Sequence, residues 1–434
     1  METIENLLRR GKRAVTGHFQ ARRDREPVCA QALLPRRFPD CGPLPIRPGP
    51  VVTGGRLTVI TDSISAGLLY GGVGTAMILG ALMSQRTGSA LRFVTRREAP
   101  QPANLDHVLA AYGIVLDRPP TFEYVSAHAG GPAIEVFDGE QFITTSWWTT
   151  AGALQSLPAE NILYLLQEDE RMFYPFGDER LLCERTFARH DIRYLVNTRL
   201  LFDHLIGTGL PHLADCGDWF EPAFPHEIFH PRPRPASARR RLLFYARPYN
   251  LRNLFYLGIE AIDRALEQGV LDADEWELVL VGRDIPNIVF SRPIECARFE
   301  HLSWTAYADV VGTVDLGLCL MYTPHPSYPP LDLAASGAVV VTNRHGLKQD
   351  LDRYSRNILC TDPETEAVVE ALGRGIALAA DTPLRERHRR ESPLGSSWQS
   401  ALVPPIDRVL RAIPPGPADM PNHRRMPSHR LHSF

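Results

Sequence analysis

Short apolar runs alternate with stretches of helical periodicity twice along this chain of 434 residues. Arg56–Asp62 (RLTVITD) and Trp276–Gly282 (WELVLVG) have the length and composition of buried strands. Helical patterns separate these runs from the next ones, which predicts βα units around a parallel sheet. A Pro-rich, basic segment at 224–241 interrupts the series once. We therefore expect an α/β fold with two consecutive doubly wound domains.

The composition of the chain shifts at several points, and these shifts suggest where its parts begin and end. Residues 414–434 are too polar and Pro-rich to pack, which predicts a disordered tail. The chain is also too long for one ordinary core. The expected parts are an amphipathic helix and Pro-rich lead-in at 1–50, a first Rossmann-like domain at 51–223, a linker at 224–241, a second Rossmann-like domain at 242–395, a C-terminal helix at 396–413 and the tail.

Charge and cysteine content exclude several classes of protein. The formal net charge is −3, spread over charges of both signs, so no global basic field points to nucleic acid as a partner. The seven cysteines form no CxxC pair, which argues against a zinc ribbon or a disulfide framework and fits a reducing compartment. No apolar run reaches the roughly 18–20 residues of a membrane span. We therefore expect a cytoplasmic protein.

One segment near the N-terminus could nevertheless touch a membrane. Ile4, Leu7, Leu8, Val15 and Phe19 fall near one helical stripe, and basic residues occupy much of the rest. Such a helix can lie in the membrane interface. A helix that docks on its own domain also explains the pattern, so peripheral contact with the inner face of a membrane stays open.

A glycine-rich loop follows the first strand and opens a helix. Backbone N–H groups around Gly72 and Gly74 could there meet an anion, although glycines that only permit close packing explain the pattern too. Met77 occupies the place of the third glycine, so the dinucleotide fingerprint is incomplete. Arg96 and Arg97 follow the next strand and would suit a 2′-phosphate. An NADP-dependent oxidoreductase is therefore one alternative.

The second domain carries two arginines at a predicted strand end. Arg247 ends one strand and Arg252 begins the next helix, at the sheet edge where α/β folds bind ligands. Ser327 and Tyr328 precede two prolines, so we expect a helix to begin there with a partial positive charge. Both arginines and the helix start would converge on a diphosphate and carry the catalysis. Pairing of the arginines with surface acids is the plain alternative.

One carboxylate stands about a turn inside that otherwise apolar helix. Asp332 would face the space beside the anion, where an acceptor-only group suits ribose hydroxyls. Alternatively it is a first-turn acid that the helix dipole stabilises by only about 0.3–1 kcal/mol.

Candidates for acceptor contact lie in the first domain. Trp147 and Trp148 could stack on sugar faces, and Glu168 and Glu170 follow a predicted strand at the rim of the cleft. Each pair could equally be structural, the tryptophans as core anchors and the acids as a solvated loop.

The chain resembles a known family in these same segments. The spacing of Arg247 and Arg252, followed by PHPSYPPLDLAASGAVVVTN, looks like the donor half of a family 4 GT-B glycosyltransferase. FYARP, TTSWW and QEDERMFYPFG, with that stretch, resemble the WsaF-like rhamnosyltransferases of surface-glycan assembly over roughly residues 55–400. The resemblance implies a GT-B fold, in which two Rossmann-like domains face a central cleft.

The resemblance also implies a reaction. In the family a basic pair holds the donor diphosphate, and Arg252 stands here where lysine is usual. Of two family glutamates eight residues apart, the first aligns with Pro324 and the second with Asp332. The implied donor is a dTDP-sugar, foremost dTDP-L-rhamnose. Transfer would retain the anomeric configuration, without metal or other cofactor, onto a growing surface glycan whose lipid-linked form is left open.

Loss of both glutamates motivates a further alternative. A glycan-assembly scaffold with a decayed donor site would keep the fold without catalysis. Three hypotheses therefore remain at this point, namely the transferase, the NADP enzyme and the scaffold.

Overall fold

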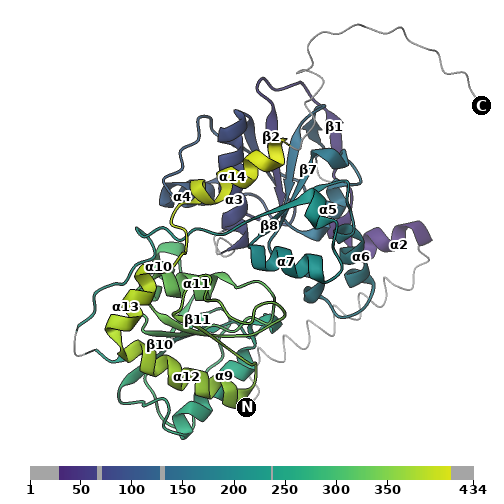
Figure 1. Cartoon of the computed structure of the whole chain (residues 1–434). Coiled ribbons are helices and arrows are strands. Elements are labelled where there is room, and N and C mark those ends of the chain that lie inside the picture. The colour runs from purple at the N-terminus through teal and green to yellow at the C-terminus, as the bar shows by residue number, and fades with distance from the viewer. Residues whose placement is uncertain (1–28, 66–70, 128–131, 236–237, 412–434) are drawn as a thin grey trace, which may run out of the picture.

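A computed structural model describes residues 29–65, 71–127, 132–235 and 238–411 (Figure 1). The expected amphipathic helix near the N-terminus and the expected tail lie outside the described residues. Figure 1 shows two α/β domains, the first in purple to teal above the second in green. Each is built on its own parallel sheet.

The first domain has a seven-stranded sheet in the order β4-β3-β2-β6-β7-β8-β9. Its strands are β2 (Arg56–Thr61), β3 (Ala90–Thr95), β4 (Thr121–Tyr124), β6 (Gln141–Thr144), β7 (Ile162–Leu166), β8 (Arg193–Asn197) and β9 (Gly217–Phe220). Its helices are α3 (Gly72–Thr87), α4 (Pro102–Ala111), α5 (Trp147–Ala153), α6 (Asp178–Phe187), α7 (Arg199–Gly207) and α8 (Leu213–Cys216), with 3₁₀ turns η3 (Ala159–Asn161) and η4 (Glu170–Phe173). The lead-in supplies α2 (Ala30–Arg37), η1 (Pro39–Cys41) and β1 (Ile46–Pro48), which pairs with β5 (Ile134–Val136).

The second domain has a six-stranded sheet in the order β12-β11-β10-β13-β14-β15. Its strands are β10 (Arg240–Ala246), β11 (Trp276–Gly282), β12 (Cys296–Glu300), β13 (Leu316–Leu318), β14 (Val339–Asn343) and β15 (Ile358–Thr361). Its helices are α9 (Phe255–Glu267), α10 (Trp304–Val311), α11 (Tyr328–Ala335), α12 (Thr365–Ala380) and α13 (Thr382–Arg390), with the 3₁₀ turn η5 (Leu251–Asn253). The strand order reverses between β10 and β13, and ligands of open α/β sheets bind at such a switch point.

Alternating side chains place each sheet between two apolar layers. In β2, Val59 belongs to a core with α3, whereas Ile60 belongs to the opposite core with Trp147 of α5. In β10, Phe244 and Leu243 divide in the same way between two cores of the second domain. The predicted doubly wound fold is therefore confirmed. The edge strand β12 was not predicted, because its side chains are exposed or only partly buried and give no apolar run.

The last described helix returns to the first domain. Helix α14 (Trp398–Arg411) packs on α3 and β9, and it appears in Figure 1 as the yellow helix on the upper domain. Trp398 and Leu402 are buried in the core of that domain. Before α14, the backbone N–H of Phe224 donates to the carbonyl of Gly395. The two connections between the domains therefore run side by side.

A buried charge network ties the first sheet together. Glu140 is fully buried and accepts hydrogen bonds from Arg56 (2.9 and 2.7 Å), Thr58 (2.5 Å) and Arg92 (2.7 Å). Arg92 is itself buried. These side chains belong to β2 and β3 and to the turn before β6, so one carboxylate fixes three neighbouring strands.

Removing this carboxylate should strongly destabilise the first domain. In Glu140→Gln the buried Arg92 keeps only its pair with Glu123 and the partly buried Arg56 loses its carboxylate partner. Breaking a buried pair of this kind costs about 3–5 kcal/mol. Unfolding in urea, monitored by tryptophan fluorescence, measures the free energy of unfolding of each variant. The exposed pair Arg199–Asp203 offers a control, since Asp203→Asn should change stability by less than about 1 kcal/mol. Equal effects of both substitutions would contradict this role for Glu140.

Candidate functional site at the domain interface

Contacts between the domains come from loops and helix starts at the carboxyl ends of the strands. Arg252 Nη1 lies 3.2 Å from Glu168 Oε2, so a charged pair joins the loops that follow β10 and β7. The hydroxyl of Tyr328, at the start of α11, lies 2.6 Å from Thr75 Oγ1 and accepts from Asn197 Nδ2 at 2.9 Å. Segments predicted separately to bind a donor therefore meet at one interface.

The glycine-rich loop faces the start of α11. Gly71 has φ +79°, and a Cβ atom there would lie 3.2 Å from the ring of Tyr328. The carbonyl of Gly72 accepts from Gln167 Nε2 at 2.8 Å, and Gly74 is buried in the first turn of α3. Close approach of the two domains therefore depends on the missing side chain at Gly71.

The two predicted arginines have different surroundings. Arg252 is largely buried between Glu168 and the ring of Phe173, whose centroid lies 4.1 Å from its guanidinium carbon. Burial lowers the pKa of Arg252, the charge of Arg247 adds to that, and Glu168 opposes both. Within the described residues no carboxylate lies within 4 Å of Arg247. The alternative of pairing with an acid therefore applies to Arg252, whose partner is Glu168 of the other domain, and not to Arg247.

Glu168 was expected on the acceptor side, and the structure brings it to the predicted donor arginine. Burial raises its pKa, and the charges of Arg252 and Lys348 oppose that rise. Its neighbour Asp169 is bonded to Arg171 at 2.7 Å. Of these two neighbouring carboxylates, Glu168 is therefore the one whose partner lies in the other domain.

Ser327 and Asp332 lie before and inside α11. Ser327 precedes the helix with φ +71°, and its side chain does not cap it. Asp332 is 7% exposed, and its Oδ2 accepts from the hydroxyl of Tyr307 in α10 at 3.1 Å. Burial raises its pKa to about 8. The expectation that Asp332 faces the open space beside the anion is corrected, because α11 turns this position toward α10. A ribose contact stays a prediction.

Trp147 and Glu170 are structural in this geometry. Trp147 is buried, and its indole N–H donates to the hydroxyl of Tyr174 at 3.0 Å. Its backbone N–H donates to Glu170 Oε2 at 2.7 Å, which places that buried carboxyl at the N-terminus of α5. Burial raises the pKa of Glu170 to about 8. The expected stacking and rim positions are corrected for these two residues, because both side chains are buried away from the domain interface.

Trp148 is only partly buried. Its indole N–H donates to Asp62 Oδ1 at 2.8 Å, and Arg97 lies over its ring at 5.4 Å. Of the predicted acceptor residues, Trp148 and Glu168 thus keep exposed surface at the carboxyl edge of the first sheet.

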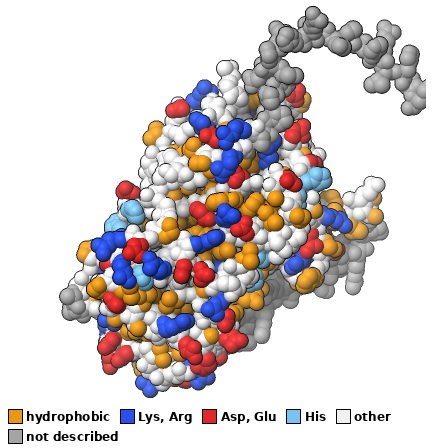
Figure 2. Space-filling model, in the orientation of Figure 1, with side chains coloured by type: hydrophobic (Ala, Val, Ile, Leu, Met, Phe, Trp, Pro, Cys, Tyr) orange, Lys and Arg blue, Asp and Glu red, His pale blue; other side chains and the backbone are white. Residues whose placement is uncertain are grey.

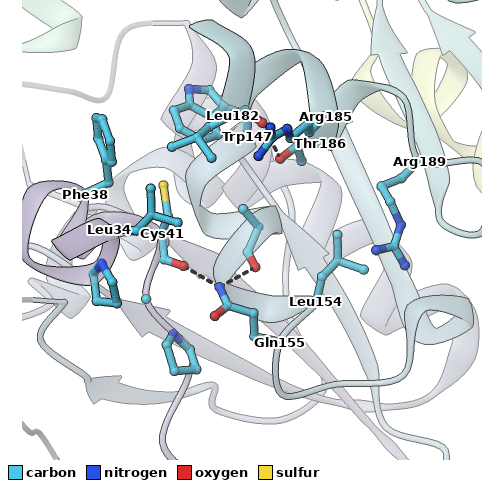
Figure 3. Close-up of a pocket in the computed structure, with 14 residues that line it drawn as sticks. Leu34, Phe38, Cys41, Trp147, Leu154, Gln155, Leu182, Arg185, Thr186 and Arg189 are labelled. Carbon is cyan, nitrogen blue, oxygen red and sulfur yellow. Dashed lines mark hydrogen bonds between the residues drawn. The ribbon is translucent and has the colours of Figure 1, made fainter. Parts of the chain in front are cut away.

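Figure 3 shows a cavity of about 320 Å³ that is separate from this interface. Its lining residues come from the lead-in and from the first domain, and none comes from the second domain. Trp147, Leu34, Phe38 and Leu154 contribute to a mostly apolar wall, and Arg185 lies at the same cavity. Trp147 is the predicted site residue that reaches it.

Sequence reasoning missed two buried groups at the interface. His325 is 4% exposed, and its Nδ1 accepts from the backbone N–H of Ser327 at 2.9 Å. Lys348 is 0% exposed, and its Nζ donates to the carbonyl of Met321 at 2.7 Å. His325 stood in a quoted motif but was not singled out. Lys348 gave no signal, because NRHGLKQD has the composition of an exposed turn.

Over the described ranges, no group of three or more His, Cys, Asp or Glu side chains could hold a metal ion. In the same part of the chain, none of the helices has the length and apolar character to cross a membrane.

Solved structures of low identity share the arrangement of both domains. Sucrose-phosphate synthase from Thermosynechococcus elongatus gives a TM-score of 0.56 at 13% identity, over 82% of this chain and 98% of that one. HepE from Anabaena, solved with UDP and glucose, gives 0.56 at 10% identity, over 82% and 99%. WaaG, a glycosyltransferase involved in lipopolysaccharide biosynthesis, gives 0.54 at 12% identity, over 82% and 99%. The two-domain fold is the GT-B fold of glycosyltransferases.

Family comparison narrows this class. The model "WsaF, N-terminal domain" matches residues 56–199, and "WsaF, C-terminal domain" matches residues 240–373. The chain belongs to the WsaF family, which confirms the resemblance seen in the sequence. The O-antigen biosynthesis protein RfbC of Myxococcus xanthus is 27% identical over 369 residues. That alignment covers 83% of this chain and 27% of RfbC, so the chain corresponds to a minor part of that relative's length.

The buried carboxyl of Glu170 should make stability depend on pH. Its pKa is about 8 in the folded state, against an ordinary value near 4.5, so the folded protein binds a proton that the unfolded chain releases. Stability should therefore fall as pH rises from about 4.5 to 8. Asp332 acts in the same direction.

Thermal unfolding between pH 5 and 8 measures this dependence. Glu170→Gln keeps an acceptor for the Trp147 N–H and removes the titrating group, so its melting temperature should vary less with pH. Asp203→Asn, at an exposed pair, serves as control and should follow the wild type. A Glu170→Gln curve parallel to the wild type would contradict the raised pKa.

Proposed function

We propose that the protein is a glycosyltransferase that moves a sugar from a nucleoside diphosphate sugar onto a growing surface glycan. Its donor is dTDP-L-rhamnose, as the resemblance implies, which makes it a rhamnosyltransferase. The observation that carries the proposal is the convergence at one interface of Arg247, Arg252 and the N-terminus of α11 opposite Gly71. These groups follow β10 and β13, which flank the switch point of the second sheet.

The reaction breaks the bond between the sugar and the diphosphate, so negative charge grows on the departing phosphate oxygens. Arg247 and Arg252 stabilise that charge, together with free backbone N–H groups at the start of α11. These cations supply the counter-charge, and the proposal includes neither a metal ion nor another cofactor. Lys348 is fully buried and Arg252 is largely so, which strengthens their electrostatic action on a bound diphosphate.

The pair between Arg252 and Glu168 links donor and acceptor sides. A diphosphate that binds Arg252 competes with Glu168, so donor binding frees a carboxylate of the first domain. Glu168 and Trp148 then contact the incoming glycan, and Glu168 can accept a hydrogen bond from its hydroxyl. Closure of the domains excludes water that would hydrolyse the activated sugar. Transfer proceeds with retention, as in the family it resembles.

The acceptor is a growing surface polysaccharide in a lipid-linked form. RfbC is named for O-antigen biosynthesis, and WaaG for lipopolysaccharide biosynthesis, which supports an acceptor of this class. The protein would work in the cytoplasm, with peripheral contact to the inner face of the membrane through the segment around Leu7 and Leu8.

Specific contacts argue against the NADP enzyme. Arg97 is paired with Asp40 at 2.9 Å and lies 3.4 Å from Asp62, so it is not free for a 2′-phosphate. The ring of Tyr328 also occupies the space beside Gly71. The scaffold hypothesis differs from the transferase in one measurable property, namely the binding of a nucleoside diphosphate.

Thermal unfolding with dTDP, UDP, GDP, ADP and NADP⁺ in separate samples tests the proposal. At 100-fold its dissociation constant, dTDP should add about 2.7 kcal/mol of stability. Arg247→Ala should abolish that gain, since it removes one of the converging cations. Arg344→Ala serves as control, because Arg344 is paired with Asp362 at the surface.

A gain with NADP⁺ alone would move the function to redox chemistry, and no gain with any nucleotide would favour the scaffold. With dTDP binding established, turnover of dTDP-L-rhamnose against other sugar nucleotides measures the donor specificity.

A further inference from the structure

His325 presents an unused hydrogen-bond donor inside the domain interface. Its Nδ1 accepts from the Ser327 N–H, and its pKa is lowered to about 3 by burial and by the charges of Lys348 and Arg252. The ring is therefore neutral, and its one proton lies on Nε2. Nε2 is buried and has no hydrogen-bond partner among the described residues. Such a donor is costly to leave unpaired.

Lys348 is a second buried donor in the same place. Its ammonium group has three N–H bonds, and the structure shows one of them directed at the carbonyl of Met321. Within the described residues no carboxylate lies within 4 Å of its Nζ. Its charge acts on His325 and on Glu168, so the three side chains are electrostatic neighbours.

Charges at this place do not balance. Three cations lie there, namely Arg247, Arg252 and Lys348, and Glu168 acts on the last two of them. Glu170 also acts on Arg252, but burial raises the pKa of Glu170 to about 8, so near pH 7 it is mostly protonated and adds little negative charge. Asp169 nearby is already paired with Arg171. The surplus of two positive charges matches in magnitude the two negative charges of a diphosphate esterified at both ends, as in a nucleotide sugar. A buried surplus of this kind is stable only when a counter-ion or solvent compensates it.

We propose that His325 Nε2–H and Lys348 Nζ are direct ligands of the donor's diphosphate. The inference rests on the proposed transferase function and goes beyond it, because neither residue belongs to the arginine pair or to the two family glutamate positions. His325 stands next to Pro324, which replaces the first of those glutamates, so a neutral donor stands beside the place of an acceptor carboxylate. The oxygens of the diphosphate accept hydrogen bonds from both groups. Arg252 then also binds these oxygens, which weakens its contact with Glu168.

A matched pair of substitutions separates the two roles of His325. In His325→Asn the amide oxygen can still accept from the Ser327 N–H, but the donor at the Nε2 position is lost. In His325→Gln an amide N–H reaches the Nε2 position. Lys348→Met removes the ammonium and keeps the length of the chain, and Arg344→Met is the control on the same loop.

Isothermal titration calorimetry with dTDP and UDP measures the dissociation constants. We expect His325→Asn and Lys348→Met each to weaken binding by about tenfold or more, as for lost hydrogen bonds to charged groups. His325→Gln should stay closer to the wild type than His325→Asn, and Arg344→Met should bind as the wild type does. Circular dichroism establishes whether each variant folds. If His325→Asn does not fold, the binding measured for Lys348→Met decides the outcome.

The outcomes separate this inference from the proposed function. If the wild type binds, Arg252→Ala does not, and both His325→Asn and Lys348→Met bind within twofold of the wild type, the two residues are structural and the inference is overturned alone. If the wild type binds neither nucleotide, the proposed function is overturned together with the inference.

Discussion

The pair formed by Arg252 and Glu168 is the contact on which the candidate site depends, because it joins a loop of one domain to a loop of the other at 3.2 Å. In isolation either domain would expose its charged group to water. Held together, the pair is largely shielded from water but its positive charge is only partly compensated, since Arg247 and Lys348 add positive charge beside it. The excess positive charge favours binding of an anion. The guanidinium of Arg252 contributes both to the contact between the domains and to the proposed binding of the ligand.

Charges on the surface of the protein are arranged differently from those in its interior. Figure 2 shows a surface in which charges of both signs are interspersed, without a single dominant field over the face displayed. Clusters of interacting charged side chains lie instead inside the protein, in the Glu140 network and at the domain interface. In the Glu140 network, Arg56 and Arg92 are balanced by Glu140 and by Glu123, which lies 2.9 Å from Arg92, and the network fixes three strands. The interface leaves its charges unbalanced, which is the pattern expected of a binding site rather than of a structural one.

The fold could be predicted from the sequence because buried parallel strands are continuous apolar runs with helical patterns between them. The predicted runs Arg56–Asp62 and Trp276–Gly282 agree closely with the observed strands β2 (Arg56–Thr61) and β11 (Trp276–Gly282). Edge strand β12 escaped because its side chains alternate between water and partial burial. At the site, sequence position identified the arginines at the sheet edge, since strand ends fix where the following residues lie. It could not show that α11 turns Asp332 inward or that a loop with the composition of a turn buries Lys348, because both depend on packing between elements distant in sequence.

The hydrogen bond between Phe224 and Gly395 has a mechanical consequence. Since α14 belongs to the first domain, the second domain is an insertion held at both of its ends by neighbouring strands of chain. Two connections at one place can act as a hinge. Rotation of the domains about it keeps the hydrogen bond between Phe224 and Gly395, whereas sliding or separation of the two connections would break it. A rotation about this place would change the contact between Arg252 and Glu168 while each sheet keeps its internal geometry.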